Sequence, residues 1–381
     1  MDHDGSGPVA AHDPRRRRLD VVCAIETHGE SDGVSDLKDR IKRLIQADGP
    51  MSISTYMQIC LHDPEDGYYA TRPGLGTDFT TAPEISQIFG ELLGLWAAHE
   101  WQQMGQPDRV NLVELGPGRA TLMVDALRAS ATVPGFHNAM QLTLIEASPA
   151  LRKLQSERLK PQTLDFQTEL TAIPEGPTII LANEYLDCLP AQQYIREGED
   201  WRERVIGLDA DGNLGFGLSA DALPVTDAPD IDAIELQPAL KTLVDQLSGL
   251  SERGDPVRAL FIDYGSANET PSDTLRAFQE GQQIHPLAAP GVSDLTVDVD
   301  FGFLRGLAHK AGLAVHGPIP QGDFLLRLGA EARLNQLAKL HPDKADDLYD
   351  GIRELVDPEQ MGTRFNAIAI SSNGLPVPAG F

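Results

Sequence analysis

The sequence is poor in cysteine, in long apolar runs and in leader-like features. The chain of 381 residues has three widely spaced cysteines, Cys23, Cys60 and Cys188. Without a Cys-x-x-Cys pair or a histidine cluster at ligand spacing, we predict neither a disulfide framework nor a metal site. No apolar run approaches the roughly 18 residues of a membrane span, and the acidic N-terminus resembles no secretory or transit signal. We therefore expect no membrane insertion and a cytoplasmic protein.

Basic residues are also scarce relative to acidic ones. The chain has 31 lysines and arginines against 57 aspartates and glutamates, a formal net charge of −26. Such a surface repels a phosphate backbone, so we expect no nucleic-acid partner. A cationic protein or peptide would be attracted, although an acidic surface also serves simply to keep a protein soluble.

One stretch, residues 110–146, has the pattern strand, glycine turn, helix, strand. A short apolar run ends in Glu114-Leu115-Gly116-Pro117-Gly118, a helical repeat follows, and a second apolar run closes at Glu146. Glycine allows a sharp turn and a close approach of the backbone to a ligand, and an acid ending the second strand can bind a ribose diol. The stretch predicts a βαβ unit with a cofactor turn.

Two cofactors compete for this turn, a nicotinamide dinucleotide and S-adenosylmethionine. A pyrophosphate favours a third small residue and a free helix N-terminus, whereas S-adenosylmethionine carries a cationic sulfonium and an amino group. Glu114, just before the turn, suits the cationic ligand better. We predict that S-adenosylmethionine binds, with its cationic end at Glu114, its ribose at Glu146, and the turn formed by Gly116, Pro117 and Gly118.

About 70 residues of predicted helix and loop precede the first strand. Residues 1–36, with a basic run at 15–18, are predicted to be a disordered tail, and residues 37–108 a helical cap. The cap comprises a helix from Leu37 to Ile45, a second helix capped by Ser54, and a long helix from Ile85 to about Met104. Between the last two, residues 74–84 are expected either to cover the cofactor, through Thr81, Pro83 and Glu84, or to serve as a surface connector.

Several blocks of the chain resemble one family. They are His62-Asp63-Pro64, Gly67-Tyr68-Tyr69, residues 78–91, Glu114 to Arg119, residues 183–190, Asp263-Tyr264-Gly265, residues 294–301, Gln321 and Phe324-Leu325. Across roughly residues 40–370 the chain is similar to the MidA-like proteins, the mitochondrial complex I assembly methyltransferases and their bacterial relatives. Three positions depart from the family pattern: Ala120 replaces a third glycine, and Ser266 and Gly281 stand where histidines are usual.

The resemblance implies a fold and an activity. The fold class is α/β, a Rossmann-like class I methyltransferase with a seven-stranded, mostly parallel sheet and helices on both faces. The donor would be S-adenosylmethionine and the acceptor an arginine of a protein, expected to be a subunit of respiratory NADH dehydrogenase during assembly. Eukaryotic members would be mitochondrial. The sequence predicts no oligomeric state.

The residues after the strand 178–182 carry the acceptor chemistry. Open α/β sheets place reactive groups at the carboxyl ends of strands, where Asn183, Glu184 and Asp187 follow. Methyl transfer is an in-line displacement that depends on alignment, and carboxylates can hold a guanidinium in a fork geometry. We predict that Glu184 and Asp187 bind the acceptor and that Asn183 lies near the cofactor. The alternative is that Asn183 and Asp187 only form the turn before Pro190.

The core, residues 109–381, is predicted to carry two insertions. Residues 191–234 are expected to form a strand pair that acts as a lid, and residues 266–300 a long polar excursion in which Asp294, Asp298 and Asp300 lie on the acidic face of a strand. Tyr264 is expected to line the acceptor pocket or to pack as an ordinary aromatic. Further expected elements are a strand at 163–168, helices at 236–250, 303–311 and 324–340, and strands at 259–262, near 314, and at 365–370.

Two other functions remain open from the sequence. A non-catalytic assembly chaperone would keep the cofactor fold, and the missing histidines at 266 and 281 favour it. A nicotinamide oxidoreductase would use the same glycine turn.

Overall fold

The computed structural model describes residues 37–71, 80–223, 231–267 and 272–381. The expected tail, part of the loop at 74–84, and short pieces of both insertions lie outside the described residues. Among the described residues, no helix is both long and apolar enough to span a membrane.

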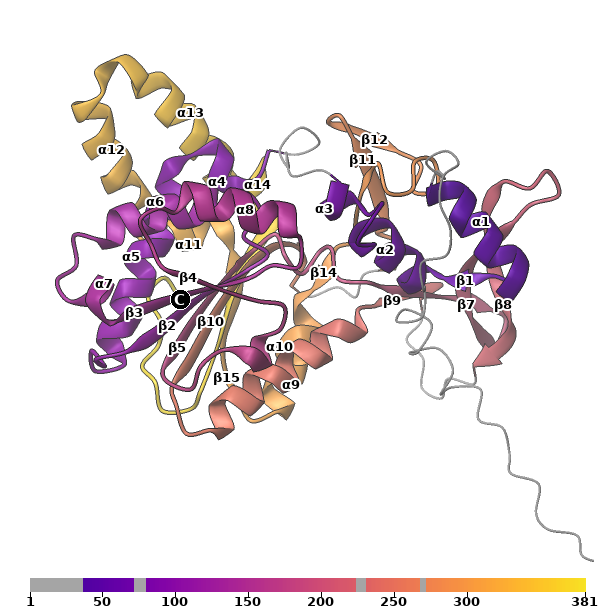
Figure 1. The fold of residues 1–381 in the computed structure, drawn as a ribbon, viewed down its shortest axis with the longest axis horizontal. Coiled ribbons are helices and arrows are strands. Elements are labelled where there is room, and N and C mark those ends of the chain that lie inside the picture. The colour runs from indigo at the N-terminus through magenta and orange to yellow at the C-terminus, as the bar shows by residue number, and fades with distance from the viewer. Residues whose placement is uncertain (1–36, 72–79, 224–230, 268–271) are drawn as a thin grey trace, which may run out of the picture. The chain divides into compact units, whose positions relative to one another are not determined.

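A mostly parallel sheet, called the central sheet below, is the largest sheet of the described residues (Figure 1). Its strand order is β15-β16-β10-β5-β2-β3-β4, and the short β14 pairs with the end of β10. β16 runs antiparallel to both of its neighbours, β10 and β15, and all other pairings in this sheet are parallel. The predicted seven-stranded sheet is thus confirmed. The strands are β2 (Val110–Leu115), β3 (Met140–Ile145), β4 (Leu164–Gln167), β5 (Thr178–Asn183), β10 (Val257–Ser266), β14 (Val299–Asp300), β15 (Ala314–Pro320) and β16 (Phe365–Ser371).

Helices cover both faces because neighbouring strand residues point to opposite sides. In β5, Ile179 and Leu181 join one apolar core and Ile180 and Ala182 join the other. The first core holds α5 (Gln87–Gln103), α6 (Thr121–Ser130), α7 (Phe136–Ala139), α11 (Gln321–Arg327), α12 (Ala330–Leu340) and α13 (Ala345–Val356). The second holds η2 (Leu170–Ala172), α9 (Pro238–Glu252) and α10 (Phe301–Lys310). The predicted helical layers on both faces are confirmed.

A second, antiparallel sheet arises from the first insertion. The predicted strand pair is wrong in extent, because β6 (Gln192–Glu197), β7 (Asp200–Leu208), β8 (Leu214–Leu223) and β9 (Ala233–Leu236) pair together and β1 (Met51–Ser52) joins β7. Helices α1 (Leu37–Asp48) and α2 (Ile53–His62) share an apolar core with residues of this sheet. Weak alternation in single strands could not reveal this pairing, since it joins segments about 150 residues apart.

The second insertion gives a three-stranded sheet. Its strands are β11 (Arg276–Gln279), β12 (Gln282–Ile284) and β13 (Asp294–Thr296). The expected strand through residues 294–300 is broken after Thr296, since β13 pairs with β11 whereas β14 pairs with β10. Its alternation is nevertheless present, with Leu295, Val297 and Val299 buried.

Several predicted helix boundaries were wrong. Ser52, not Ser54, caps α2, and its hydroxyl accepts a hydrogen bond from Thr55 N at 3.0 Å. The expected helix at 324–340 is two helices, because Gly329 adopts φ +95° between them. Residue Leu236 ends a strand, and α9 starts only at Pro238. Helix α13 was not predicted. The remaining short elements are α3 (Tyr68–Thr71), α4 (Ala82–Ile85), α8 (Pro149–Arg158), η3 (Pro342–Lys344) and α14 (Met361–Arg364).

A buried ion pair joins α5 to the sheet. Arg258 on β10 and Glu100 on α5 are both fully buried, with Nε and Oε2 3.1 Å apart. Arg258 also donates to Ser371 Oγ and to Pro376 O, and Glu100 accepts from Ala379 N. The pair thus fastens residues 371–379 against the first core.

Arg258→Met tests this fastening. The substitution leaves the buried Glu100 carboxylate without its cation, so we expect a loss of about 3 to 5 kcal/mol in the free energy of unfolding. Urea denaturation measures it. The double variant Arg258→Met/Glu100→Gln is the control and should recover part of the loss; equal losses in both variants would contradict the assignment.

Candidate functional site

The candidate site lies where four parallel strands of the central sheet end. β2 is followed by Gly116 and β3 by Glu146. β5 ends at Asn183, with Glu184 directly after it, and Asp263 and Tyr264 lie in the last part of β10, before its end at Ser266. Because parallel strands end at the same edge, segments about 30 to 150 residues apart in the sequence meet here.

The glycine turn after β2 has the backbone shape that its sequence predicts. Gly116 and Gly118 adopt φ +59° and +50°, in the left-handed region that favours glycine. A Cβ on Gly116 would lie 2.9 Å from Cδ2 of Tyr185, so the backbone approaches the segment after β5 closely. Pro117 accepts a hydrogen bond from Ala120 N at 2.7 Å. Ala120 itself has φ +59°, which explains physically why glycine suits this family position.

Two carboxylates flank the turn. Glu114 on β2 is 4% exposed, and its Oε2 has no hydrogen-bond partner within the described part of the chain. Burial raises its pKa to about 8. Glu146, directly after β3, accepts from Ser148 N at 2.8 Å and from Gln155 Nε2 at 3.1 Å. A buried carboxylate oxygen without a hydrogen-bond partner in the described residues, beside a turn with glycine at two of its three positions, fits a ligand with a cationic end. The residues present therefore fit S-adenosylmethionine.

Glu184 begins the turn after β5 in an unusual conformation. Its φ of +50° is left-handed, which costs a non-glycine residue about 1 to 2 kcal/mol. Such strain is often found at functional sites. Its Oε1 accepts from Ala82 N at 3.0 Å and from Asn183 Nδ2 at 2.9 Å. Burial, helped by the nearby charges of Asp187 and Glu84, raises the pKa of Glu184 to about 7.

Asp187 and Asp263 complete an acidic cluster with Glu184. Asp187 Oδ2 accepts from the Tyr264 hydroxyl at 2.9 Å and from Thr296 Oγ1 at 2.8 Å. Asp263 is fully buried and accepts from the backbone N–H groups of Leu186 and Asp187. Burial raises the pKa of both carboxyls, and that of Asp263 is raised further by the charge of Asp187.

The structure therefore brings the predicted acceptor residues together and adds two others. Glu184 and Asp187 belong to one acidic cluster but accept hydrogen bonds from different groups of the protein. Asp263 and Thr296 were not predicted to act at the site, although both lie in blocks of the sequence that resemble the family; their contacts with Asp187 depend on the tertiary structure. Asn183 Oδ1 is buried and unpartnered within the described residues.

The described end of the loop before α5 reaches this cluster. Thr81 is the N-cap of α4 and Pro83 lies in its first turn, and Ala82 N donates to Glu184. Glu84 forms an ion pair with Arg119, next to the glycine turn, at 3.3 Å. Residues 72–79 lie outside the described part. These contacts place Thr81, Pro83 and Glu84 beside both the acidic cluster and the glycine turn.

The two missing histidines have different surroundings. Ser266 ends β10, three residues after Asp263, and pairs in register with Asp300 of β14. Glu280 and Gly281 form the tight turn between β11 and β12 with φ +51° and +74°. Two left-handed residues are what a two-residue hairpin turn requires, and glycine is favoured there.

The acidic cluster carries an unbalanced charge. Glu114, Glu184, Asp187 and Asp263 form no ion pair with a lysine or arginine in the part of the chain that the structure describes. The described part of the chain also contains no group of three histidine, cysteine, aspartate or glutamate side chains arranged to hold a metal ion. Buried and half-buried carboxylates without a cationic partner among the described residues favour a cationic organic ligand.

Known proteins were found to be similar in both sequence and structure. A family model described as S-adenosyl-L-methionine-dependent methyltransferase matches residues 92–319. A Drosophila melanogaster protein named protein arginine methyltransferase NDUFAF7 homolog, mitochondrial, is 37% identical over 89% of this chain and 85% of its own length. The Homo sapiens protein named protein arginine methyltransferase NDUFAF7, mitochondrial, is 34% identical over 86% of this chain and 81% of its own.

One solved structure shares most of the fold. A Burkholderia thailandensis protein, crystallised with S-adenosyl-homocysteine, superposes with a TM-score of 0.76 at 24% identity and covers 90% of this chain and 93% of its own. Its strand-and-helix architecture supports the fold assignment.

The sheet order and the glycine turn define a class I methyltransferase fold. The chain belongs to the family of S-adenosylmethionine-dependent methyltransferases, and S-adenosylmethionine is its cofactor. The glycine turn alone could have bound either S-adenosylmethionine or a nicotinamide dinucleotide. Membership of this family excludes the nicotinamide dinucleotide. The prediction that eukaryotic relatives are mitochondrial is confirmed by their names, whereas the cytoplasmic location of this protein is not confirmed.

Gly116→Val tests the cofactor turn. A branched side chain would clash with Tyr185 and disfavour the left-handed backbone, so we expect calorimetric binding of S-adenosyl-homocysteine to be lost. The control is Gly212→Val, at a glycine with φ +76° and open space around it, far from the site in the sequence. Undiminished binding by Gly116→Val would place the cofactor elsewhere.

Glu114→Gln tests the buried carboxyl. Because its pKa in the folded protein is raised to about 8, folding keeps this group protonated, and stability is lost as pH rises from about 4.5 through 8. We expect the amide to raise the free energy of unfolding by roughly 1 to 3 kcal/mol at pH 9 and to change it little at pH 4. Urea denaturation across this range measures the difference; an effect independent of pH would show that Glu114 is ionised throughout.

Proposed function

We propose that the protein transfers a methyl group from S-adenosylmethionine to the side chain of an arginine in a protein substrate. The observation that carries the proposal is the acidic cluster of Glu184, Asp187 and Asp263 beside the glycine turn, which forms no ion pair with a lysine or arginine in the described part of the chain. A guanidinium supplies the missing positive charge, and its N–H groups match carboxylate oxygens in a fork geometry. The names of the related proteins specify the same acceptor for those proteins.

The cluster suits the chemistry that a guanidinium requires. S-adenosylmethionine supplies a methyl group on a positively charged sulfur. A guanidinium has a pKa above about 12 and is a poor nucleophile, so its orientation in a site without water determines the rate. Glu184 and Asp187 bind the guanidinium and concentrate its charge on the nitrogens that do not react. A carboxylate of the cluster then takes the proton that the methylated nitrogen loses.

Each remaining site residue has a role in this proposal. Gly116, Pro117 and Gly118 form the turn under the cofactor, Glu114 faces its cationic end and Glu146 its ribose. Asn183 orients Glu184 through the 2.9 Å hydrogen bond and lies next to the cofactor. Thr81, Pro83 and Glu84 close the site from the side of α4, since Ala82 N already donates to Glu184.

The substrate we propose is a subunit of respiratory NADH dehydrogenase, methylated during assembly. The family resemblance implies this substrate, and the formal charge of −26 favours a cationic protein surface. The alternative, an assembly chaperone without turnover, is favoured by Ser266, because it stands three residues after Asp263, where the family has histidine.

Glu184→Gln is the test of the catalytic assignment. The amide keeps the size of the side chain but cannot balance a guanidinium, so we expect methylation to fall at least about 100-fold. In the wild-type protein, methylation should rise as pH increases through about 7, because the Glu184 carboxyl with its raised pKa ionises there. Mass spectrometry of arginines in NADH dehydrogenase subunits co-expressed with each variant measures the first effect.

The control is Glu175→Gln, at an exposed glutamate away from the site. Unchanged methylation by Glu184→Gln would show that the assignment is wrong. Assembly that proceeds with no methylated arginine in any subunit would instead support the chaperone.

A further inference from the structure

Tyr264 is held on several sides at the edge of the acidic cluster. Its ring meets Phe365 edge to face with centroids 5.4 Å apart. The guanidinium of Arg364 lies 5.1 Å from the ring centroid and that of Arg276 6.0 Å, within the range of cation–π contacts. The ring is therefore fixed, and its hydroxyl donates to Asp187 Oδ2 at 2.9 Å.

Asp298 holds the two arginines in place. Arg364 binds it in a fork, with Nη1 2.9 Å from Oδ2 and Nη2 2.7 Å from Oδ1, and Arg276 forms an ion pair with the same carboxylate. Asp298 follows Thr296 by two residues, and Thr296 donates to Asp187. One short segment thus contacts Asp187 directly and fixes the arginines that pack on Tyr264.

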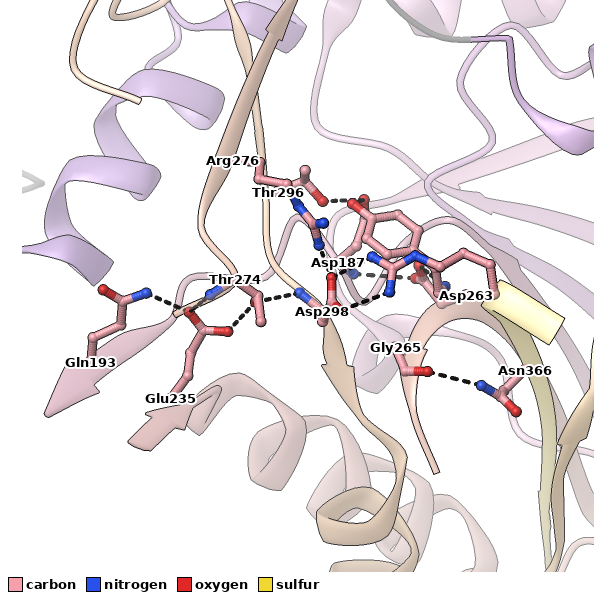
Figure 2. A network of polar contacts seen from close by, with 12 residues as sticks. Asp187, Gln193, Glu235, Asp263, Gly265, Thr274, Arg276, Thr296, Asp298 and Asn366 are labelled. Carbon is pink, nitrogen blue, oxygen red and sulfur yellow. Dashed lines mark hydrogen bonds and ion pairs between the residues drawn. The ribbon is translucent and has the colours of Figure 1, made fainter. Parts of the chain in front are cut away.

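This arrangement continues into the inserted sheets (Figure 2). Asp298 N donates to Thr274 Oγ1 at 2.7 Å, and Thr274 hydrogen-bonds to Glu235 on β9. Gln193 on β6 donates to Glu235 at 2.6 Å. A continuous series of polar contacts therefore connects the first inserted sheet to the wall of the acidic cluster.

The backbone at the end of β10, directly after Tyr264, is also constrained. Gly265 has φ +151°, and a Cβ there would lie 2.1 Å from Val299 O, so only glycine allows β14 to pack against β10. Asn366 Nδ2 donates to Gly265 O at 3.0 Å. These contacts fix the backbone beside Tyr264 independently of its side chain.

We propose that Tyr264 is a positioning residue, which orients Asp187 toward the acceptor guanidinium, and that Asp298, Arg276 and Arg364 act through Tyr264. The inference rests on the proposed function, because it assigns a purpose to the orientation of Asp187. It also gives the two arginines a role distinct from substrate binding, since their guanidinium groups are already bound to Asp298.

The hydroxyl has a specific electrostatic effect. An O–H donated to a carboxylate stabilises its charged form, so the Tyr264 hydroxyl opposes the rise in the pKa of Asp187 that burial causes. Within the described residues, the ionisable groups around Asp187 are Glu184, Asp263, Asp294, Tyr69, Cys188 and Tyr264. His62 packs against Tyr69, and Arg276 and Arg364 lie over the ring of Tyr264, but no lysine or arginine in this part of the chain forms an ion pair with Asp187. Two hydroxyl donors, from Tyr264 and Thr296, thus favour an ionised Asp187 before an acceptor binds, together with backbone N–H groups at Asp187 and Cys188.

Tyr264→Phe removes the hydroxyl and keeps the ring between Phe365 and the arginines. Carbon-13 NMR of the aspartate carboxyl carbons, assigned with Asp187→Asn, measures the pKa of Asp187 without any substrate. We expect an upward shift of about one unit in Tyr264→Phe. Arg364→Lys retains the charge but loses the fork, so a smaller shift in the same direction is expected.

Binding of Nα-acetyl-L-arginine amide to the protein saturated with S-adenosyl-homocysteine is the second measurement. We expect Tyr264→Phe to weaken this calorimetric binding about tenfold at pH 7, with the loss recovering at higher pH, and to leave S-adenosyl-homocysteine binding unchanged. The controls are Tyr349→Phe, whose hydroxyl bonds to Asn335 on another helix, and Arg305→Met at an exposed position of α10.

The two measurements separate the proposals. A wild-type protein that binds S-adenosyl-homocysteine but not the arginine amide would contradict the proposed acceptor, while the NMR shift would still decide the role of Tyr264. An Asp187 pKa that is the same in Tyr264→Phe and wild type would overturn the positioning role. Equal shifts in Tyr264→Phe and Tyr349→Phe would also overturn it, because the effect would then not be local.

Discussion

The gathering of carboxylates without ion-pair partners among the described residues, at the edge of the central sheet, is the constraint on which the site depends. Glu114 and Asp263 are buried and Glu184 and Asp187 half-buried, and within the described residues the hydrogen bonds of this group come from backbone N–H groups, hydroxyls and one amide. Isolated buried charge is costly, so the protein holds these groups at raised pKa values until positive charge arrives. In the function proposed above, S-adenosylmethionine and the acceptor arginine supply that positive charge.

The fold supplies this environment with ordinary means. Parallel strands end at one edge, apolar helices seal both faces, and the left-handed turns at Gly116 and Glu184 bring two strand ends close together. The strain at Glu184 is tolerated because its backbone N–H is bound by Ile262 O and its carboxylate by Ala82 N. The packing and hydrogen bonds of the regular elements thus offset the strain of the irregular turn at Glu184.

The insertions provide one wall of the acidic cluster. β13 supplies Thr296, the segment after it supplies Asp298, and β11 supplies Arg276, while α14 supplies Arg364 from the far end of the chain. These residues surround Tyr264 from outside the core sheet. In a family that shares its cofactor fold, such inserted elements are where differences between substrates can be built.

The sequence by itself determined the central part of this protein. The apolar runs at 110–115, 140–145 and 178–182, the glycines between them and the acids at their ends obey local rules of strand, turn and helix, so the cofactor half of the site and both helical layers could be predicted. Glu184 and Asp187 could also be named, because they follow a buried strand directly.

Only the tertiary structure decided the rest. The five-stranded sheet needs β1 to pair with β7, and the break after Thr296 depends on which neighbour each strand finds. Asp263, Thr296 and the two arginines around Tyr264 become neighbours of Asp187 through contacts between segments up to about 180 residues apart in the sequence. Periodicity within a segment carries no information about such pairings, because the free energy that selects them comes from packing and charge between segments.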